Sequence, residues 1–447
     1  TAVVYREEEG IAYALVMVVC AAVGALMTYK KPNNPSFYAK EGFVCTALGW
    51  ILMSAFGCVP FMLTGEIPSF VDAMFEMVSG FTTTGASVVL NVEELSHCTN
   101  MWRCFSHWIG GMGILVFLLA VLPLVGGSNM QLMKAESPGP SVGKLVPKVR
   151  FTARILYVLY VALTVLQVLV MLLGGMTFYE ALCTSFGTAG TGGFGIKADC
   201  LASYTPYQQW VIAIFMLIFG VNFNLYYLIL IRRARSAFKS EELWAYVGIV
   251  LVASGLICYN IRAIYPALSD AARQSAFQVA SIITTTGYST ANFDTWPQLS
   301  RHILLILMFI GGCAGSTAGG LKVSRVVLMF KNIKLNLKKL IHPRAVGTAR
   351  FAGKTVETET LQGLGVYIGL YSVLLILILL ILAFDPIEYN IETNFSAAVS
   401  CFNNVGPGFG GVGPALSYAD YSPLSKLVLS FSMLLGRLEK KLGYFKI

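Results

Sequence analysis

Long apolar segments separated by polar stretches run through the whole chain. Most of them reach the roughly 20 residues that a helix needs to cross the hydrocarbon core of a bilayer. We predict spanning helices near 10–29, 42–63, 104–124, 152–174, 207–231, 243–265, 301–330, 361–384 and 423–437. The pattern predicts an all-α polytopic membrane protein.

Four shorter helical stretches lie between these segments and are too short to cross a bilayer. They run near 69–80, 176–187, 270–283 and 391–402. Each ends in a run of small and polar residues that are rich in Gly, Thr or Asn. We expect them to enter and leave the membrane on the same side, as re-entrant half-helices.

Composition strengthens the membrane assignment. Of the 447 residues, 56% are hydrophobic and 12% are charged, and the mean hydropathy is +0.69. Average soluble chains are about 45–50% apolar and about 25% charged. A water-soluble surface cannot be built from so few charges, which excludes soluble enzymes, nucleic-acid-binding proteins and secreted disulfide scaffolds. No paired Asp, His cluster or Ser–His arrangement at one depth favours an intramembrane enzyme.

The positions of Lys and Arg predict the orientation. Loops within 30–40, 134–154, 232–239 and 322–354 hold 21 of these residues, whereas the opposite loops and the short helices hold five. Cytoplasmic loops carry such an excess, so the half-helices enter from the outer side. That side also carries thirteen acidic residues. They either concentrate cations at the outer mouth of a pore or are ordinary solvated loop charges.

The ends of the four half-helices form an internal repeat. They read Thr82-Thr83-Thr84-Gly85, Gly190-Thr191-Gly192-Gly193, Thr284-Thr285-Thr286-Gly287 and Asn403-Asn404-Val405-Gly406. In the second run Gly192 is adjacent to Gly193, so its register could differ by one residue. The repeat divides the chain into an N-terminal helix and linker, 1–41, and four units: 42–150, 151–240, 241–357 (with an intramembrane gating loop) and 358–447.

Four such runs favour a pore. Irregular backbone at membrane depth is tolerated only where it lines a cavity or is buried in protein, and equivalent loops achieve this together around one axis. Rings of backbone carbonyls replace the hydration shell of a cation. The four runs hold no carboxylate, which favours a monovalent ion. The candidate ion-binding residues are Thr83, Thr84, Gly85, Thr191, Gly192, Gly193, Thr285, Thr286, Gly287, Asn404, Val405 and Gly406.

A second glycine-rich run interrupts the segment 301–330. Five of the ten residues in 311–320 are Gly, and each costs a helix about 1 kcal/mol relative to Ala. We expect the helix to break here and leave a flexible loop across the conduction path.

These motifs resemble those of the TrkH/KtrB/HKT potassium-transporter superfamily, with the bacterial TrkH type most similar. The resemblance covers nearly the whole chain. It is carried by Phe81-Thr82-Thr83-Thr84-Gly85-Ala86, Trp108-Ile109-Gly110-Gly111-Met112-Gly113, the run from Ile310 to Gly320, His342-Pro343-Arg344-Ala345-Val346, Asn403-Asn404-Val405-Gly406-Pro407-Gly408 and Gly436-Arg437-Leu438-Glu439.

The resemblance implies four K⁺-channel-like helix–pore-helix–helix units around one pore in a single chain, working as a homodimer. It implies one selectivity-filter glycine per unit, with K⁺ as the transported ion at the filter carbonyls. It also implies a gate, in which the intramembrane loop blocks the pore and an Arg on the last helix contacts it. The alternative for that Arg is snorkelling to the cytoplasmic interface. The candidate gate residues are Gly311, Gly312, Gly315, Ser316, Thr317, Gly319, Gly320 and Arg437.

The family further implies K⁺ uptake across a bacterial inner membrane under the control of a cytosolic, TrkA-like nucleotide-binding ring. This chain has no Rossmann fingerprint, so we expect no organic cofactor in it. The basic segments 232–239 and 331–354 are candidate docking surfaces, or else orientation signals that contact lipid headgroups. An H⁺- or Na⁺-coupled potassium symporter is the alternative function.

Two departures from the family stand out. Only one helix precedes the first unit, which is consistent with a further helix before Thr1. The last helix would continue apolar after Glu439, whereas this chain continues as Lys440-Lys441-Leu442-Gly443-Tyr444-Phe445-Lys446-Ile447.

Overall fold

The computed structural model describes residues 1–29, 39–113, 149–342, 347–351, 354–356 and 358–438. The first part of the chain forms α1 (Ala2–Tyr5), α2 (Gly10–Thr28), α3 (Ala39–Gly57), α4 (Val59–Leu63), α5 (Phe70–Phe81) and α6 (His97–Gly111). The next part forms α9 (Val149–Leu173), α10 (Phe178–Gly190), α11 (Pro206–Phe219), α12 (Phe223–Leu230) and α13 (Ala234–Phe238).

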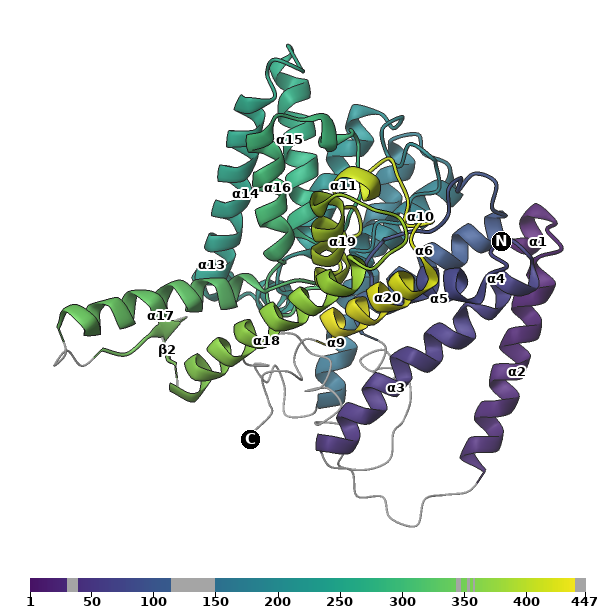
Figure 1. The fold of residues 1–447 in the computed structure, drawn as a ribbon, viewed down its shortest axis with the longest axis horizontal. Coiled ribbons are helices and arrows are strands. Elements are labelled where there is room, and N and C mark those ends of the chain that lie inside the picture. Colours follow the sequence, from purple (N-terminus) through teal and green to yellow (C-terminus); the bar gives the residue numbers. More distant parts are fainter. Residues whose placement is uncertain (30–38, 114–148, 343–346, 352–353, 357, 439–447) are drawn as a thin grey trace.

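The second half of the chain is also mostly helical (Figure 1). It forms α14 (Glu241–Asn260), α15 (Leu268–Ile283), η1 (Phe293–Thr295), α16 (Gln298–Phe309), α17 (Val323–Ile341), α18 (Thr358–Leu382), α19 (Ile391–Asn403), η2 (Gly410–Val412) and α20 (Pro423–Arg437). The described strands are β1 (Arg350–Phe351) and β2 (Lys354–Thr355), which pair in antiparallel fashion before α18.

Several helices are long and apolar enough to cross a bilayer, as a multi-pass membrane protein requires. Within the described ranges there are five, at Gly10–Thr28, Val44–Leu63, Arg154–Leu173, Glu241–Asn260 and Thr358–Leu382. The first of these, α2, buries none of its residues and runs along the outside of the molecule (Figure 1). The predicted span 104–124 is described only to residue 113, where α6 has already ended.

One predicted span is wrong. The segment 207–231 is not a continuous helix, because α11 and α12 meet at an angle of 89°. Gly220, Val221 and Asn222 separate them, and Asn222 begins α12 by accepting a hydrogen bond from the Asn224 amide at 2.9 Å. The predicted break within 301–330 is confirmed, since α16 ends at Phe309 and α17 begins at Val323.

The four predicted half-helices are present as α5, α10, α15 and α19. Three of them begin at a side chain that caps the helix: Ser69, Thr177 and Asn390 each accept a hydrogen bond from a backbone amide of the first turn. Such caps satisfy amides that have no partner inside the helix. A half-helix that starts in this way needs no continuation on its outer side.

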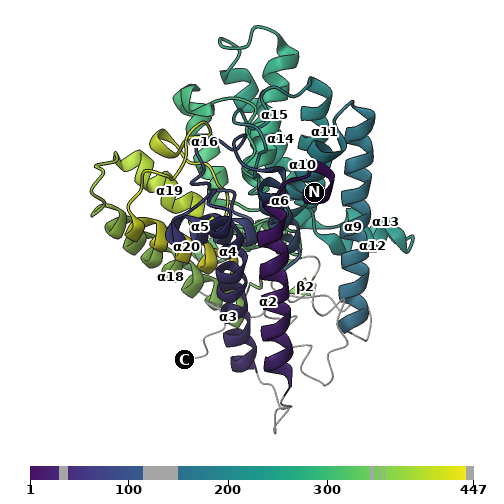
Figure 2. The same cartoon turned by 90° about the vertical axis from the view of Figure 1, so that its right-hand side faces the viewer.

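The short helices pack in a closed circuit. In the order α5, α6, α10, α11, α15, α16, α19 and α20, each helix contacts the next one, and α20 contacts α5. Figure 2 shows α18, α19 and α20 together on the left and α9 and α11 on the right. The turns that follow the four half-helices also contact one another.

Candidate functional site

The turns that follow the four half-helices share one backbone conformation. A residue with a left-handed φ comes first, namely Thr83 (58°), Thr191 (55°), Thr285 (54°) or Asn404 (56°). Two residues later a glycine also has positive φ: Gly85 (82°), Gly193 (81°), Gly287 (84°) or Gly406 (105°). Positive φ is unfavourable for residues with a side chain and easy for Gly. Four copies of the same strained turn therefore stand at four equivalent places.

A repeated hydrogen bond fixes the register of the four turns. In each, the amide before the glycine donates to a carbonyl five residues earlier: Thr84 to Ser79 (2.9 Å), Gly192 to Gly187 (2.9 Å), Thr286 to Ser281 (2.8 Å) and Val405 to Ser400 (2.9 Å). Gly192 thus corresponds to Thr84, and Gly193 corresponds to Gly85. The register that the sequence left open in the second turn places Gly193 with the other three glycines.

Each of the four glycines lies against the backbone of the next turn, and the fourth lies against the first, so the contacts form a closed cycle. A Cβ added to Gly85 would lie 2.0 Å from the carbonyl oxygen of Gly192, and one added to Gly193 would lie 1.9 Å from that of Thr286. The cycle continues from Gly287 to Val405 (2.3 Å) and closes from Gly406 to Thr84 (2.7 Å). Each contact is too close for any side chain, so the geometry requires Gly at all four places.

Side chains behind the turns tie them together. The hydroxyls of Thr82 and Thr84 lie 2.8 Å apart, and those of Thr284 and Thr286 lie 2.7 Å apart. The Asn404 amide group donates to the Thr84 hydroxyl at 2.9 Å, which joins the fourth turn to the first. These hydroxyls are turned toward one another rather than exposed, so they brace the backbone.

His107 and a buried ion pair, neither singled out from the sequence, join the first two turns. His107 Nδ1 lies 2.7 Å from the Gly80 carbonyl oxygen, and its Nε2 accepts from the Phe194 amide at 3.2 Å. The sequence offered no signal for it, because a lone His on a helix is usually a satisfied core residue.

The ion pair joins Glu76 on α5 to Arg103 on α6. The carboxylate Oε1 lies 2.7 Å from Arg103 Nη2, and both side chains are essentially inaccessible. The other oxygen accepts from the Val88 amide at 2.9 Å, and the guanidinium lies over the Phe194 ring at 4.3 Å. We counted both among the charges of the outer loops and short helices. The structure buries them behind the first two turns, so they are not solvated loop charges.

The glycine-rich run 310–322 forms a compact loop at the break between α16 and α17. The Gly311 amide donates to the Leu321 carbonyl at 2.8 Å and the Val323 amide to the Gly312 carbonyl at 3.2 Å, which closes the base of the loop. Ser316 Oγ donates to the Cys313 carbonyl at 2.7 Å within it. At the tip, the Gly319 amide donates to Thr285 Oγ1 at 2.6 Å. The loop therefore contacts the third turn directly.

The loop fills the break between α11 and α12. The Cys313 amide donates to the Gly220 carbonyl at 2.9 Å, and the Gly315 carbonyl accepts from the Phe223 amide at 3.1 Å. Thr317 Oγ1 donates to the Phe219 carbonyl at 3.3 Å. Helix ends leave backbone groups without partners, and such groups are costly inside a membrane. The loop between α16 and α17 thus provides hydrogen-bond partners for the backbone groups at the break between α11 and α12.

Arg437 reaches the same loop from the end of α20. Its Nη1 donates to the Thr317 carbonyl at 3.1 Å, and its Nη2 donates to the Gly111 carbonyl at 2.9 Å and to the Gly110 carbonyl. The guanidinium is half-buried and held between the loop and the C-terminal end of α6. Contact with the loop, rather than snorkelling away from it, is therefore the arrangement in the structure.

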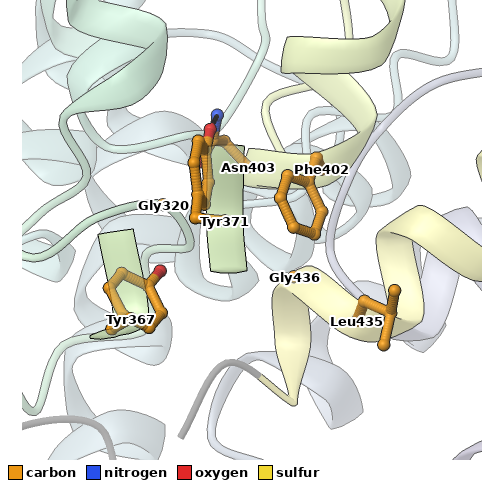
Figure 3. Close-up of a pocket in the computed structure, with 7 residues that line it drawn as sticks. All are labelled: Gly320, Tyr367, Tyr371, Phe402, Asn403, Leu435 and Gly436. Carbon is orange, nitrogen blue, oxygen red and sulfur yellow. Dashed lines mark hydrogen bonds between the residues drawn. The ribbon is translucent and has the colours of Figure 1, made fainter. Parts of the chain in front are cut away.

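A small pocket lies on another side of the loop. It is lined by Gly320, Tyr367, Tyr371, Phe402, Asn403, Leu435 and Gly436 (Figure 3). Tyr371 stacks on Phe402 with ring centroids 4.7 Å apart and accepts a hydrogen bond from Asn403 Nδ2 at 2.8 Å. The loop is thus packed against α11 and α12 but borders a pocket beside α18, α19 and α20.

Comparisons with known proteins converge on one family. The model of the TrkH family, described as cation transport protein, matches residues 10–245 and 262–441. The Trk system potassium uptake protein TrkH of Salmonella typhimurium is 35% identical over 448 residues, covering 98% of this chain and 91% of that protein. The protein of the same name from Escherichia coli K12 is 34% identical, with the same coverage. The crystal structure of the potassium transporter TrkH from Vibrio parahaemolyticus has a TM-score of 0.87 at 31% identity, covering 99% of this chain and 92% of that one.

The buried ion pair predicts a large effect on stability. Replacing Glu76 with Gln leaves the Arg103 charge buried without its partner, which typically costs about 3–5 kcal/mol. We expect a clearly lower apparent Tm, measured as recovery of monodisperse protein by size-exclusion chromatography after heating in detergent. Glu388→Gln at an exposed site is the control and should leave Tm unchanged. Equal Tm values for Glu76→Gln and the unmodified protein would contradict a stabilising role of the pair.

Proposed function

Because the chain belongs to the TrkH family of cation transport proteins, we propose that it takes up K⁺ through a transmembrane pore lined by its four glycine-containing turns. Members of this family are transporters and not enzymes, and the apolar helices make this chain a multi-pass membrane protein. The observation that carries the proposal is the cycle of close contacts that links Gly85, Gly193, Gly287 and Gly406. A single chain arranged in this way encloses one passage.

The turns provide oxygen ligands for a dehydrated monovalent cation. We assign K⁺ to the backbone carbonyls of three residues in each turn, ending at the four glycines. Rings of carbonyl dipoles replace the hydration shell of K⁺, and the half-helices direct their C-terminal ends, which carry partial negative charge, at the same place. On this assignment the chain consists of four K⁺-channel-like units, 42–150, 151–240, 241–357 and 358–447, around one pore.

The loop 310–322 serves as the gate in this proposal. Its tip lies against Thr285, and a Cβ at Gly319 would lie 2.6 Å from the Asn403 carbonyl oxygen, so the loop stands close to two of the four turns. Arg437 holds the tip through the Thr317 carbonyl and brings a positive charge to it. A cation leaving the filter would meet both the loop and this charge.

We further propose a homodimer in a bacterial inner membrane, controlled by a cytosolic, TrkA-like nucleotide-binding ring. Support comes from the relatives, which are named as parts of a Trk system. The candidate docking surfaces are the basic segments 232–239 and 331–354. Residues 343–346 and 352–353 of the second segment, and Glu439 beyond Arg437, lie outside the described residues.

Ion flux tests the function directly. Protein reconstituted in vesicles should move Rb⁺ down its gradient without a gradient of H⁺ or Na⁺, and its expression should restore growth at low K⁺ in cells that lack potassium uptake. Obligatory dependence of Rb⁺ movement on an H⁺ or Na⁺ gradient would identify a coupled symporter instead. Absence of Rb⁺ movement under both conditions, from monodisperse protein, would contradict the proposal.

The filter assignment predicts an effect of Gly287→Ser. The added Cβ would lie 2.3 Å from the Val405 carbonyl oxygen and 2.9 Å from Pro407 Cδ, at a φ of +84°. The turn must shift, so we expect the ratio of K⁺ to Na⁺ uptake to fall while the protein still reaches the membrane. Gly255→Ser on α14 has open space at its Cβ and serves as the matched control. An unchanged ratio in well-expressed Gly287→Ser would refute the assignment.

The gate assignment predicts that shortening the segment 311–320 raises flux. A shorter loop cannot both close its base and reach Thr285, so the passage below the filter should open. We expect Rb⁺ uptake by purified protein in vesicles to increase, with selectivity largely retained. Normal or lower flux from correctly folded, shortened protein would count against the loop as a barrier.

A further inference from the structure

Both ends of the intramembrane loop converge on one carboxylate, that of Glu242 in the first turn of α14. Its Oε1 accepts hydrogen bonds from the amide of Ala314 at 2.6 Å and from the amide of Ser324 at 3.1 Å. Glu242 is only 7% exposed. The preceding residue, Glu241, is different: its side chain is 46% exposed and pairs with Lys331 at 2.7 Å. Two adjacent glutamates on one helix thus have distinct environments.

The two amides that Glu242 binds lie on opposite sides of the loop tip. Ala314 belongs to the entering arm of the loop, and Ser324 lies in the first turn of α17, which leaves it. Between them lie Thr317 and Gly319, which contact Arg437 and Thr285. A carboxylate that binds both arms therefore determines how far the tip extends toward the filter.

Several contacts offset the cost of burying the Glu242 carboxylate. It lies in the first turn of α14 and accepts a hydrogen bond from the first turn of α17, and both helix N-termini stabilise negative charge. The Lys322 ammonium, which donates to the carbonyls of Ala318 and Gly319, also interacts electrostatically with this carboxylate. Hydrogen bonds to a charged group are about twice as strong as neutral ones.

We propose that Glu242 is a positioning residue that holds the gate loop in its blocking place; this rests on the proposed function of the loop. Moving the loop away from the filter requires breaking one or both of the bonds to Glu242. On its other side the loop borders a small pocket at Gly320 (Figure 3). Loss of the two bonds to Glu242 removes part of what holds the loop in place, while its bonds to Thr285 and Arg437 remain.

The test is basal flux through the purified protein in vesicles, without any cytosolic partner. We expect Glu242→Ala to raise Rb⁺ uptake about tenfold, the shift in population expected when opening no longer breaks one charge-assisted hydrogen bond. Glu242→Gln keeps the size and an acceptor oxygen, and should give a smaller increase. Glu241→Ala is the matched control and should leave basal uptake unchanged, because Glu241 is an exposed side chain that pairs with Lys331.

Three readouts separate a positioning role from a merely structural one. The ratio of Rb⁺ to Na⁺ uptake should stay at its original value in the Glu242 variants, because the filter is untouched. Glu242→Asp should return basal uptake toward the original level. Combining Glu242→Ala with Arg437→Ala should raise uptake by less than the product of the single effects, since both residues act on one loop.

The outcomes distinguish this inference from the function on which it rests. Monodisperse Glu242→Gln and Glu242→Ala proteins with unchanged or lower basal uptake, beside a loop-shortened protein with raised uptake, would overturn the role of Glu242 and leave the gate standing. Unchanged uptake in the loop-shortened protein as well would overturn the gate itself. If Glu242→Ala does not fold, the basal uptake of Glu242→Gln alone tests the role of Glu242.

Discussion

The structure depends on the rule that every backbone amide and carbonyl at membrane depth needs a partner. Irregular segments obtain partners from one another here, rather than from regular helices. The break between α11 and α12 is filled by the loop between α16 and α17, and the turn after each half-helix is bounded by the next turn. Each of these irregular segments would be costly alone, and together they supply one another's partners.

Much of this architecture is readable from the sequence because it is periodic or repeated. The four half-helices, their glycines and the break within 301–330 were predictable, since a short apolar stretch followed by Gly and Thr is a local signal. The break at Gly220 was not: one Gly inside an apolar run is usually tolerated in a helix, and only the distant residues Cys313 and Gly315 stabilise the broken form.

The functional side chains missed from the sequence share one property: their partners are remote. Glu76 lies in a predicted half-helix and Arg103 directly before a predicted span, and nothing local shows that the two are buried together. Glu242 stands beside an exposed glutamate of identical type, and its role appears only when residues 314 and 324 are brought to it. The local sequence pattern was enough to predict the four turns. The buried charged side chains around them could be found only from tertiary contacts.

The cycle of contacts has a consequence for biosynthesis. Gly406 approaches the Thr84 carbonyl, and Asn404 bonds to the Thr84 hydroxyl, across 320 residues of chain. A ribosome delivers the first turn long before the fourth, and the cycle cannot close until Asn404 and Gly406 have been made. The nascent protein must therefore carry the first three turns without the contacts that the fourth turn supplies until that turn is inserted.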